Sequence, residues 1–332
     1  MPSRPRVLSG IRPTGAGFQL GNYLGAVRNW AQMQDENECF YFVADLHAMS
    51  EEFDPAVLLR RTHESVAELL AMGIDPARST VFVQSHVPEH TELAWVLTCM
   101  TGYGEASRMT QFKDKSSGSG PVSLGLLVYP VLQAADILIY QADAVPIGED
   151  QRQHLELTRD LAQRFNSRYG DTFTLPAAYQ PKQGERIKDL QTPEKKMSKS
   201  LGGQGTLWVL DDPAVITKKV KSAVTDLGRE VTYDVEGKPG ISNLLTIMSV
   251  ATGKAVPELA AAYAGKGYGD FKKDVAEAVV ELFAPVRARY AELVADPAHL
   301  DDVLAQGAVR AREVAGATLA AVRERVGLLP AR

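Results

Sequence analysis

Apolar runs of strand length alternate with helix-patterned segments along the first part of the chain, and this alternation limits the possible folds more than any other feature. The order is 6–11 (strand), 22–34 (helix), 39–44 (strand), 55–72 (helix), 80–84 (strand) and 89–99 (helix). Strands that alternate with helices in this way form a parallel sheet with helices on both faces. We therefore predict that the chain begins with an α/β domain.

The middle of the chain departs from this rhythm. Residues 107–120, SRMTQFKDKSSGSG, are polar and glycine-rich, which predicts a mobile basic loop inside a middle insertion around 105–125. A mostly apolar stretch at 122–140 follows and is interrupted by Pro130, and a short strand is expected at 145–147.

The strand signal nearly vanishes beyond residue 211. Segments with helical spacing lie at 151–166, 213–224, 242–252, 256–263, 271–294 and 300–326. We therefore predict a domain boundary near residue 208, with an α/β domain at 1–208 and an all-helical domain at 209–332.

The overall charge and hydropathy exclude several classes of protein. The formal net charge is −5, so the chain is not a general DNA-binding protein, and an RNA partner would need a local basic surface. No apolar run has transmembrane length, and the first residues lack the apolar core of a signal peptide. These features predict a cytoplasmic protein without a membrane partner.

Cysteine and histidine spacing gives no sign of a metal site. Cys39 and Cys99 are far apart and form no CxxC motif, so neither a disulfide framework nor a zinc site is expected. His86 and His90 have the spacing of a helical metal pair, but Pro88 between them indicates a loop instead.

A glycine-containing loop follows the first expected strand. Gly15, Gly17 and Gly21 precede the first helix, where backbone N–H groups and a helix N-terminus can approach a phosphate. In a dinucleotide-binding G-x-G-x-x-G motif the third glycine would come one residue earlier. Asp45, at the end of the second strand, could imitate the ribose-binding acid, so an NAD-dependent oxidoreductase stays open as an alternative.

A second candidate for phosphate binding is the loop at 196–200. Lys196 and Lys199 are three residues apart, and Met197 and Ser198 separate them. Two lysines on a flexible loop can close on a polyphosphate, although a basic pentapeptide can also be a solvated cluster. The presence of a phosphate-type loop earlier in the same α/β domain favours the first interpretation.

Together the two loops resemble the two signatures of class I aminoacyl-tRNA synthetases. Gln19-Leu20-Gly21-Asn22 takes the place of the His-Ile-Gly-His type motif, and residues 196–200 match the KMSKS motif completely. Six further segments resemble the bacterial tryptophanyl-tRNA synthetase family, in order along nearly the whole chain: 9–15 (SGIRPTG), 109–113 (MTQFK), 129–130 (YP), 134–138 (AADIL), 148–151 (GEDQ) and 238–245 (KPGISNLL).

The resemblance implies a Rossmann-like catalytic domain, a helical anticodon-binding domain and a homodimer, whose interface would be apolar surface near the third strand and the middle segment. It implies that L-tryptophan and ATP give tryptophanyl-adenylate and pyrophosphate, with Mg²⁺ held mainly by the phosphates, and that tRNA(Trp) then accepts the acyl group. The carboxylate of the amino acid is the nucleophile, so catalysis would consist of positioning and charge stabilisation.

The resemblance also implies roles for individual residues. Lys115, Lys196 and Lys199 would stabilise the departing pyrophosphate. The ATP site would comprise Arg12, Pro13, Thr14, Gly21, Asn22, Gly148, Glu149, Asp150, Ile187, Lys196, Met197, Ser198, Lys199 and Ser200. The amino-acid site would comprise Asp136, Tyr129, Gln151, His47 and Gln133. Four residues depart from the usual family sequence and leave the detailed packing of the pocket open: Leu8, Arg12, Gln19 and Gln133.

Asp136 is the expected specificity residue, and a physical reason independent of the family supports this role. An indole has one N–H donor and no acceptor, so a buried acceptor rejects analogues that lack the donor. Asp136 has apolar neighbours on both sides in AADILIY, which disfavours a solvated helix face. A tyrosine pocket would also need an acid for the phenol, so a tyrosyl-tRNA synthetase stays open as an alternative.

Overall fold

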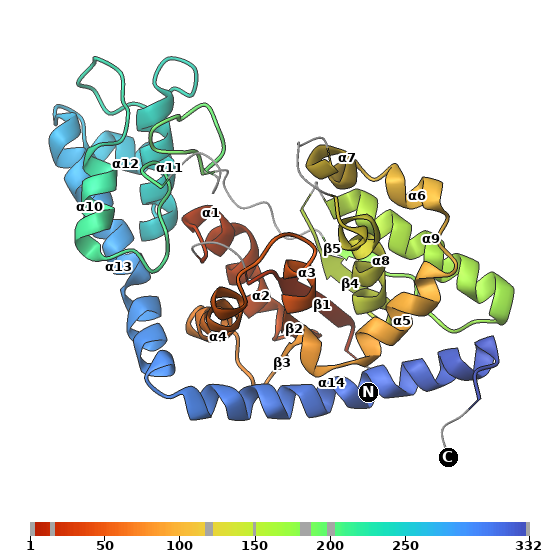
Figure 1. Cartoon of the computed structure of the whole chain (residues 1–332). Coiled ribbons are helices and arrows are strands. Elements are labelled where there is room, and N and C mark those ends of the chain that lie inside the picture. The colour runs from red at the N-terminus through yellow and green to blue at the C-terminus, as the bar shows by residue number, and fades with distance from the viewer. Residues whose placement is uncertain are drawn as a thin grey trace.

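The computed structural model describes residues 4–13, 17–116, 122–148, 151–179, 187–197 and 203–329, apart from the side chains of 114–116. Within these ranges, a five-stranded sheet has the strand order β3-β2-β1-β4-β5, and each neighbouring pair is parallel (Figure 1). The strands are β1 (Arg6–Ile11), β2 (Glu38–Val43), β3 (Thr80–Val83), β4 (Ala144–Pro146) and β5 (Ala177–Tyr179).

The central strands are buried on both faces, as parallel strands usually are. On β2, Cys39 and Tyr41 point into one apolar core, whereas Phe40 and Phe42 point into the other. Successive side chains of a strand alternate between the faces, so one continuous apolar run supplies both cores. The predicted parallel α/β sheet is confirmed.

Helices from opposite halves of the α/β region cover the two faces (Figure 1). One face packs against α1 (Leu20–Asn22), the π-helix η1 (Tyr23–Val27), α2 (Arg28–Met33) and α4 (Pro55–Ala71). The other face packs against α5 (Glu89–Thr98), α8 (Leu124–Leu138) and α9 (Arg152–Tyr169). Short helices α3 (Asp45–Ala48) and η2 (Gln84–His86) follow β2 and β3 directly.

The middle segment differs from the expected loop. Helices α6 (Tyr103–Ser107) and α7 (Thr110–Ser116) occupy much of the range predicted to be a mobile loop. Met109 is buried in the core beside α8, and Phe112 packs against the same core. These two apolar anchors explain the error, because the prediction gave more weight to the Gly/Ser run after them. Helix α8 also continues through Pro130 instead of breaking there.

At 212–329 the regular secondary structure is helical, as expected. The helices are α10 (Pro213–Lys221), α11 (Pro239–Thr252), α12 (Val256–Ala262), α13 (Tyr268–Val294) and α14 (Pro297–Val326). Among the residues with described positions, no single helix is long and apolar enough to cross a membrane, although the bent pair of α11 and α12 meets the length and composition limits together.

The last helix returns to the α/β region and packs along β3 and α5 (Figure 1). A Cβ atom at Gly307 would lie 1.7 Å from the carbonyl oxygen of Val81, so only glycine allows this approach of α14 to the strand. Arg310 donates to the carbonyl of Pro76 at 2.9 Å, and Arg312 donates to that of His86 at 2.8 Å. A boundary at residue 208 remains a proposal, because α14 shares a core with the sheet.

Candidate active site

A pocket of about 400 Å³ opens at the carboxyl ends of β1, β2 and β4 and along one face of α8. β1 has β2 on one side and β4 on the other, so the order of strand addition reverses at this point. In open parallel sheets, ligands bind at such a switch point. The volume is within the range of about 300–1,000 Å³ that small-molecule sites have.

The wall of this pocket is largely apolar. Leu8 and Phe42 come from the two central strands, Trp30 comes from α2, and Ile137 and Val145 come from α8 and β4. Aromatic and branched side chains of this kind accept a flat ring and exclude water. The pocket therefore suits a planar, mostly apolar group.

Asp136 brings a carboxylate to this apolar pocket. It lies on α8 and is 1% exposed. Its Oδ1 accepts hydrogen bonds from Nε2 of Gln84 at 2.7 Å and from Nδ1 of His90 at 2.6 Å. Its Oδ2 accepts a hydrogen bond from Nε2 of His47 at 2.7 Å. Three elements that follow β2 and β3 thus converge on one carboxylate.

The network keeps Asp136 ionised. Burial raises the pKa of this carboxyl group, but the electrostatic and hydrogen-bonding effects of His47, followed by those of His90, outweigh burial and lower the pKa to about 2. At neutral pH the group is a carboxylate, which can only accept hydrogen bonds. The pocket therefore offers a buried acceptor to a ligand.

Polar side chains form another part of the pocket. Tyr129 donates from its hydroxyl to Oε1 of Gln111 at 2.8 Å and lies 3.2 Å from Nε2 of His154. Oε1 of Gln151 lies 2.8 Å from Nδ1 of His154 and 3.5 Å from Nε2 of Gln133. Tyr129, Gln133 and Gln151 all line the pocket, so the structure brings these three predicted residues together.

Arg12 adds a positive charge to the same pocket. Its Nη1 lies 3.3 Å from Oε1 of Glu51, and its Nε is buried with no hydrogen-bond partner among the described residues. Pro13, the next residue, is buried, and Gly148 lines the pocket from the segment after β4. Arg12 and Gly148 therefore reach this site from adjacent strands.

The two signature segments are in direct contact. Gln19, immediately before α1, donates from Nε2 to the carbonyl of Met197 at 3.0 Å. The backbone N–H of Leu20 donates to the carbonyl of Leu207 at 2.9 Å. The N–H of Met197 in turn donates to the carbonyl of Ile187 at 3.2 Å, and both side chains are buried. Segments almost two hundred residues apart in sequence thus form one unit.

Three more predicted ATP residues belong to these segments. Gly21 and Asn22 lie in α1, and Asn22 is exposed. Lys196 forms a backbone bridge with Lys188, whereas its own side chain is exposed. An exposed ammonium group on an anchored backbone is available to an anionic ligand. The remaining predictions lie outside the described residues or side chains: Thr14, Lys115, Glu149, Asp150, Ser198, Lys199 and Ser200.

Comparison with known proteins decides the family. The profile of the family described as tRNA synthetases class I (W and Y) matches residues 2–284. The chain belongs to this family. A protein from Streptomyces avermitilis named Tryptophan--tRNA ligase 2 is 57% identical over 332 residues, which cover 99% of this chain and 98% of the relative. A Tryptophan--tRNA ligase of Mycobacterium leprae is 55% identical over 98% of this chain and 97% of the relative.

Solved structures agree with this class I membership. The tryptophanyl-tRNA synthetase of Campylobacter jejuni, complexed with ADP and tryptophan, has a TM-score of 0.88 and 36% identity, with coverage of 97% of this chain and 100% of that chain. A tyrosyl-tRNA synthetase of Archaeoglobus fulgidus has a TM-score of 0.66 and 21% identity, which shows a common fold alone. The predicted family and its Rossmann-like fold are confirmed.

Membership in the class I family excludes the oxidoreductase alternative, and Asp45 shows the structural reason. Oδ1 of Asp45 accepts hydrogen bonds from the backbone N–H groups of Leu46 and Ser85, each at 3.0 Å. The side chain that could have imitated a ribose-binding acid therefore joins the turns after β2 and β3.

Three residues of the Asp136 network were not predicted from the sequence as site residues. Gln84 and His90 donate to the carboxylate, and Tyr140 contacts Nε2 of His90 at 2.7 Å. A buried carboxylate needs several donors, so Asp136 in an apolar helix signals that such partners exist. Sequence spacing does not identify the two donors, because Gln84 and His90 lie 52 and 46 positions from Asp136.

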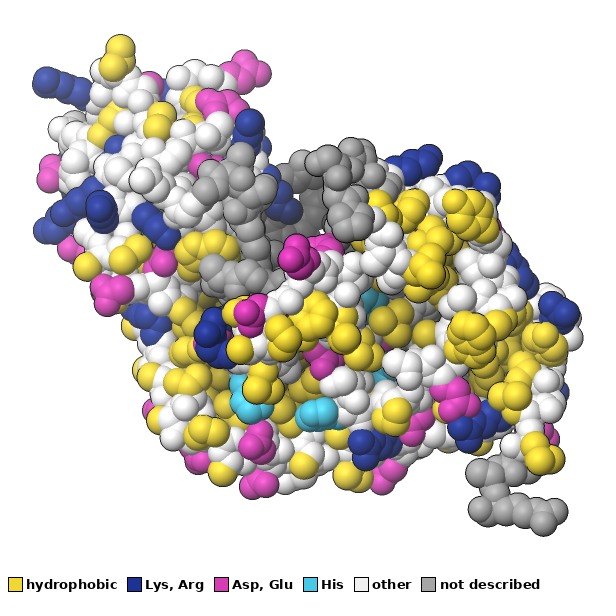
Figure 2. Space-filling view, viewed as in Figure 1, with side chains coloured by type: hydrophobic (Ala, Val, Ile, Leu, Met, Phe, Trp, Pro, Cys, Tyr) yellow, Lys and Arg dark blue, Asp and Glu magenta, His cyan; other side chains and the backbone are white. Residues whose placement is uncertain are grey.

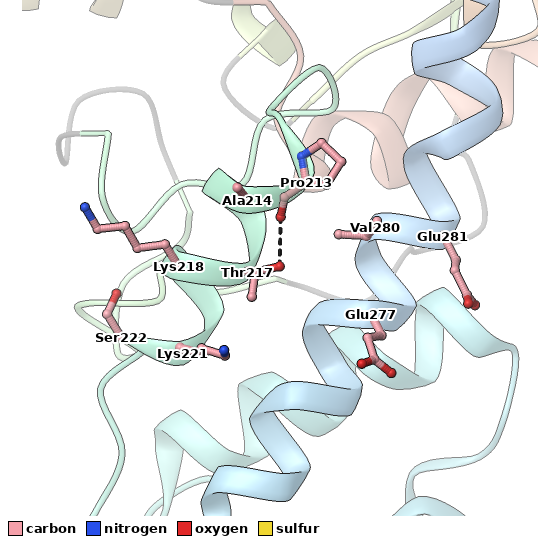
Figure 3. Close-up of a pocket in the computed structure, with 9 residues that line it drawn as sticks. All are labelled: Pro213, Ala214, Thr217, Lys218, Lys221, Ser222, Glu277, Val280 and Glu281. Atoms are coloured by element: carbon pink, nitrogen blue, oxygen red, sulfur yellow. Dashed lines mark hydrogen bonds between the residues drawn. The ribbon is translucent and has the colours of Figure 1, made fainter.

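A second pocket, of about 850 Å³, lies in the helical part of this class I synthetase between α10 and α13 (Figure 3). Its lining includes Lys218 and Lys221 on α10 and Glu277 and Glu281 on α13. In Figure 3 the side chain of Lys218 is directed away from α13. The residues predicted to bind tryptophan and ATP are absent from the described lining of this pocket.

Proposed function

We propose that this class I synthetase is a tryptophan–tRNA ligase, which activates L-tryptophan with ATP and transfers it to tRNA(Trp). The similarity of nearly the whole chain to relatives with this name carries the proposal, and the buried Asp136 in a pocket with apolar walls supplies the acceptor that an indole needs. Relatives that are 51–57% identical over nearly the whole chain have the name Tryptophan--tRNA ligase, with or without a number.

The pocket supplies what an indole needs. The apolar wall accepts the ring. Among the described residues, Oδ2 of Asp136 accepts one hydrogen bond, from His47, so a second N–H can approach it. An analogue without the N–H would leave this acceptor unpaired in an apolar site, which is costly. We assign tryptophan selectivity to Asp136, with His47 beside it, and the amino-acid end to Tyr129, Gln133 and Gln151.

The activation step needs positioned cations and no protein nucleophile. The carboxylate oxygen of tryptophan attacks the α-phosphorus of ATP, a new P–O bond forms, and the bond to the β-phosphate oxygen breaks to release pyrophosphate. Lys196, Lys199 and Lys115 are proposed to stabilise the charge on the departing pyrophosphate. Mg²⁺ is proposed to enter with ATP and to be held mainly by its phosphates.

We assign the remainder of the ATP site to residues of the first loop and of the segment after β4. Gly148 and Arg12 line the pocket with Asp136, and Pro13 is buried next to Arg12. Gly21 and Asn22 belong to the unit that Gln19 joins to the lysine segment, and the buried Ile187 is hydrogen-bonded to Met197 of that segment. This arrangement would place the α-phosphate between tryptophan and the lysines.

We propose the cytoplasm as the place of action, where tRNA is charged.

The helical region at 209–332 is proposed to be an anticodon-binding domain, with Lys218 of α10 as a phosphate contact. Lys218→Glu is expected to raise KM for tRNA several-fold and to lower the dependence of log KM on log salt concentration by about one unit, because one phosphate contact is lost. Tryptophan-dependent ATP–pyrophosphate exchange should not change. Aminoacylation measured at several salt concentrations checks this prediction.

The matched control is Arg168→Glu, which makes the same charge change at the exposed end of α9. If both variants raise KM for tRNA equally, the effect comes from net charge and Lys218 has no specific contact.

A homodimer is proposed through the apolar surface of α5, α6 and the start of α8, where α5 and α6 each pack on α8. Trp95 is 68% exposed, Tyr103 77% and Leu124 79%, and hydrophobic side chains gather over this part of the molecule in Figure 2. Large apolar side chains that are exposed together in one patch indicate a surface that binds another protein.

Trp95→Glu is expected to weaken the dimer at least about thirtyfold, since loss of an aromatic hot spot costs about 2 kcal/mol or more. Sedimentation velocity over a range of concentrations measures the effect. Leu227→Glu, at an exposed leucine in the helical region, is the control and should leave the dimer intact. A monomeric wild type, or equal effects of the two changes, would exclude this interface.

The proposed function is tested by aminoacylation with purified transcripts. Charging of tRNA(Trp) with tryptophan, and no charging of tRNA(Tyr) with tyrosine, is the expected result. The reverse pattern would identify a tyrosyl enzyme and overturn the proposal.

A further inference from the structure

We propose that His90 is a positioning residue for tryptophan, which selects the oxygen of Asp136 that receives the indole N–H. The inference rests on the proposed function and deepens it. His90 is fully buried on α5 and is absent from the described lining of the pocket, whereas Asp136 and His47 line it. His90 therefore reaches the pocket through two residues that line it: Asp136, by a hydrogen bond, and Phe42, by ring packing.

The protons in the network follow from the carboxylate. Because Asp136 is ionised, Nδ1 of His90 must carry the proton in the 2.6 Å bond to Oδ1. On the other side of the ring, Nε2 of His90 lies 2.7 Å from the hydroxyl of Tyr140. Burial, together with the charge of Asp136, raises the pKa of the Tyr140 hydroxyl, which keeps its proton. Tyr140 can therefore donate to Nε2 and hold His90 in the tautomer that donates to Asp136.

A count of the acceptor positions on Asp136 shows which oxygen is left for the indole N–H. A carboxylate has about four lone-pair positions, two on each oxygen. Gln84 and His90 fill both positions on Oδ1, at 2.7 and 2.6 Å. His47 takes one position on Oδ2 at 2.7 Å, and among the described residues no other hydrogen bond to this oxygen is present. One position remains, on the oxygen that His47 shares with the pocket.

The ring of His90 also has little freedom to move. It packs against Phe42 and Phe82, with ring centroids 6.0 Å away in each case, and against Tyr140 at 5.3 Å. Gln84, the other donor to Oδ1, leaves its own Oε1 buried without a partner among the described residues. An unpaired buried acceptor costs stability. The orientation of Gln84 is therefore better explained by the need for a donor to Oδ1 of Asp136 than by folding alone.

Two near-isosteric substitutions separate the two hydrogen bonds of His90. In His90→Asn, the side-chain amide N–H takes the place of Nδ1 and can still donate to Asp136, but the contact with Tyr140 is lost. In His90→Gln, the longer amide can reach Tyr140 and loses the donor to Asp136. His90→Leu removes both bonds. The three variants are compared with wild type in tryptophan-dependent ATP–pyrophosphate exchange.

We expect His90→Gln and His90→Leu to raise KM for tryptophan by about ten- to a hundredfold, the scale of a lost hydrogen bond to a charged group. KM for ATP and kcat should stay within about threefold, and His90→Asn should stay within about threefold of wild type in all three constants. The analogue with sulfur in place of the indole N–H should be discriminated against less strongly by His90→Gln and His90→Leu than by wild type or His90→Asn.

The outcomes separate this inference from the proposed function. Equal losses in His90→Asn and His90→Gln, or a rescue by Gln rather than Asn, overturn the positioning role and leave the function intact. A parallel rise of KM for ATP and tryptophan, with unchanged discrimination against the analogue, shows a structural role only. Absence of tryptophan-dependent exchange in the wild type overturns the proposed function and, with it, the inference.

Discussion

Asp136→Ala is expected to lower kcat/KM for tryptophan by about 10²- to 10³-fold while KM for ATP stays within twofold. The variant removes the acceptor for the indole N–H, which is a hydrogen bond to a charged group worth about 1.5–3 kcal/mol. It also leaves the donors of His47, His90 and Gln84 without their common acceptor, and the local packing of the pocket loosens. Exchange kinetics with tryptophan and ATP varied separately measure the two constants.

Asp136→Asn is the matched variant, because it keeps the volume of the side chain. Its amide can still accept from Gln84 and His90 with the oxygen, but its NH₂ group then faces His47 and the indole N–H. We expect selectivity for tryptophan to fall nearly as far as in the alanine variant, with a smaller loss of thermal stability. Unchanged discrimination between tryptophan and its sulfur analogue in both variants would contradict the role of Asp136.

Lys196→Ala is expected to lower kcat of the exchange reaction by about 10²-fold, which is typical for the loss of one group that stabilises developing charge. KM for tryptophan should change little, since Lys196 is absent from the described lining of the tryptophan pocket. Its backbone is held by the bridge to Lys188, so its side chain can act from a defined position. Pre-steady-state measurement of adenylate formation separates this step from product release.

Lys195→Ala is the control for Lys196. The two lysines are neighbours and both side chains are exposed, but only Lys196 belongs to the pentapeptide. If the lysines form a plain solvated cluster, the two variants will lower kcat by the same small factor. A specific loss in Lys196→Ala distinguishes a contact with the leaving pyrophosphate from a general electrostatic effect.

The sheet could be predicted because its strands are buried on both faces. A run such as 39–44 is apolar at every position, and no helix-length pattern competes with it. Strand β5 (Ala177–Tyr179) was not predicted, since it is three residues long and largely exposed. Helix α7 was missed because the anchors Met109 and Phe112 act through tertiary packing, which composition does not show.

The site could be predicted one residue at a time but not as a network. Asp136 could be predicted because a carboxylate in an apolar helix is costly to bury unless it pairs with a donor. Its donors Gln84 and His90 stand on other elements, and no pattern in the sequence joins residues about fifty positions apart. The contact of Gln19 with Met197 shows the same limit: both segments were recognised, but their hydrogen bond depends on the fold.

The most direct test of the central claim is ATP–pyrophosphate exchange by the purified wild-type chain, with tryptophan and tyrosine compared under identical conditions. A buried acceptor in an apolar pocket can pair with an indole N–H or with a phenol O–H, so this comparison decides between the two substrates. The proposed function requires rapid exchange with tryptophan and only background exchange with tyrosine. Exchange with tyrosine but not tryptophan would contradict the assignment of the pocket. Exchange with neither amino acid would contradict the proposed activity.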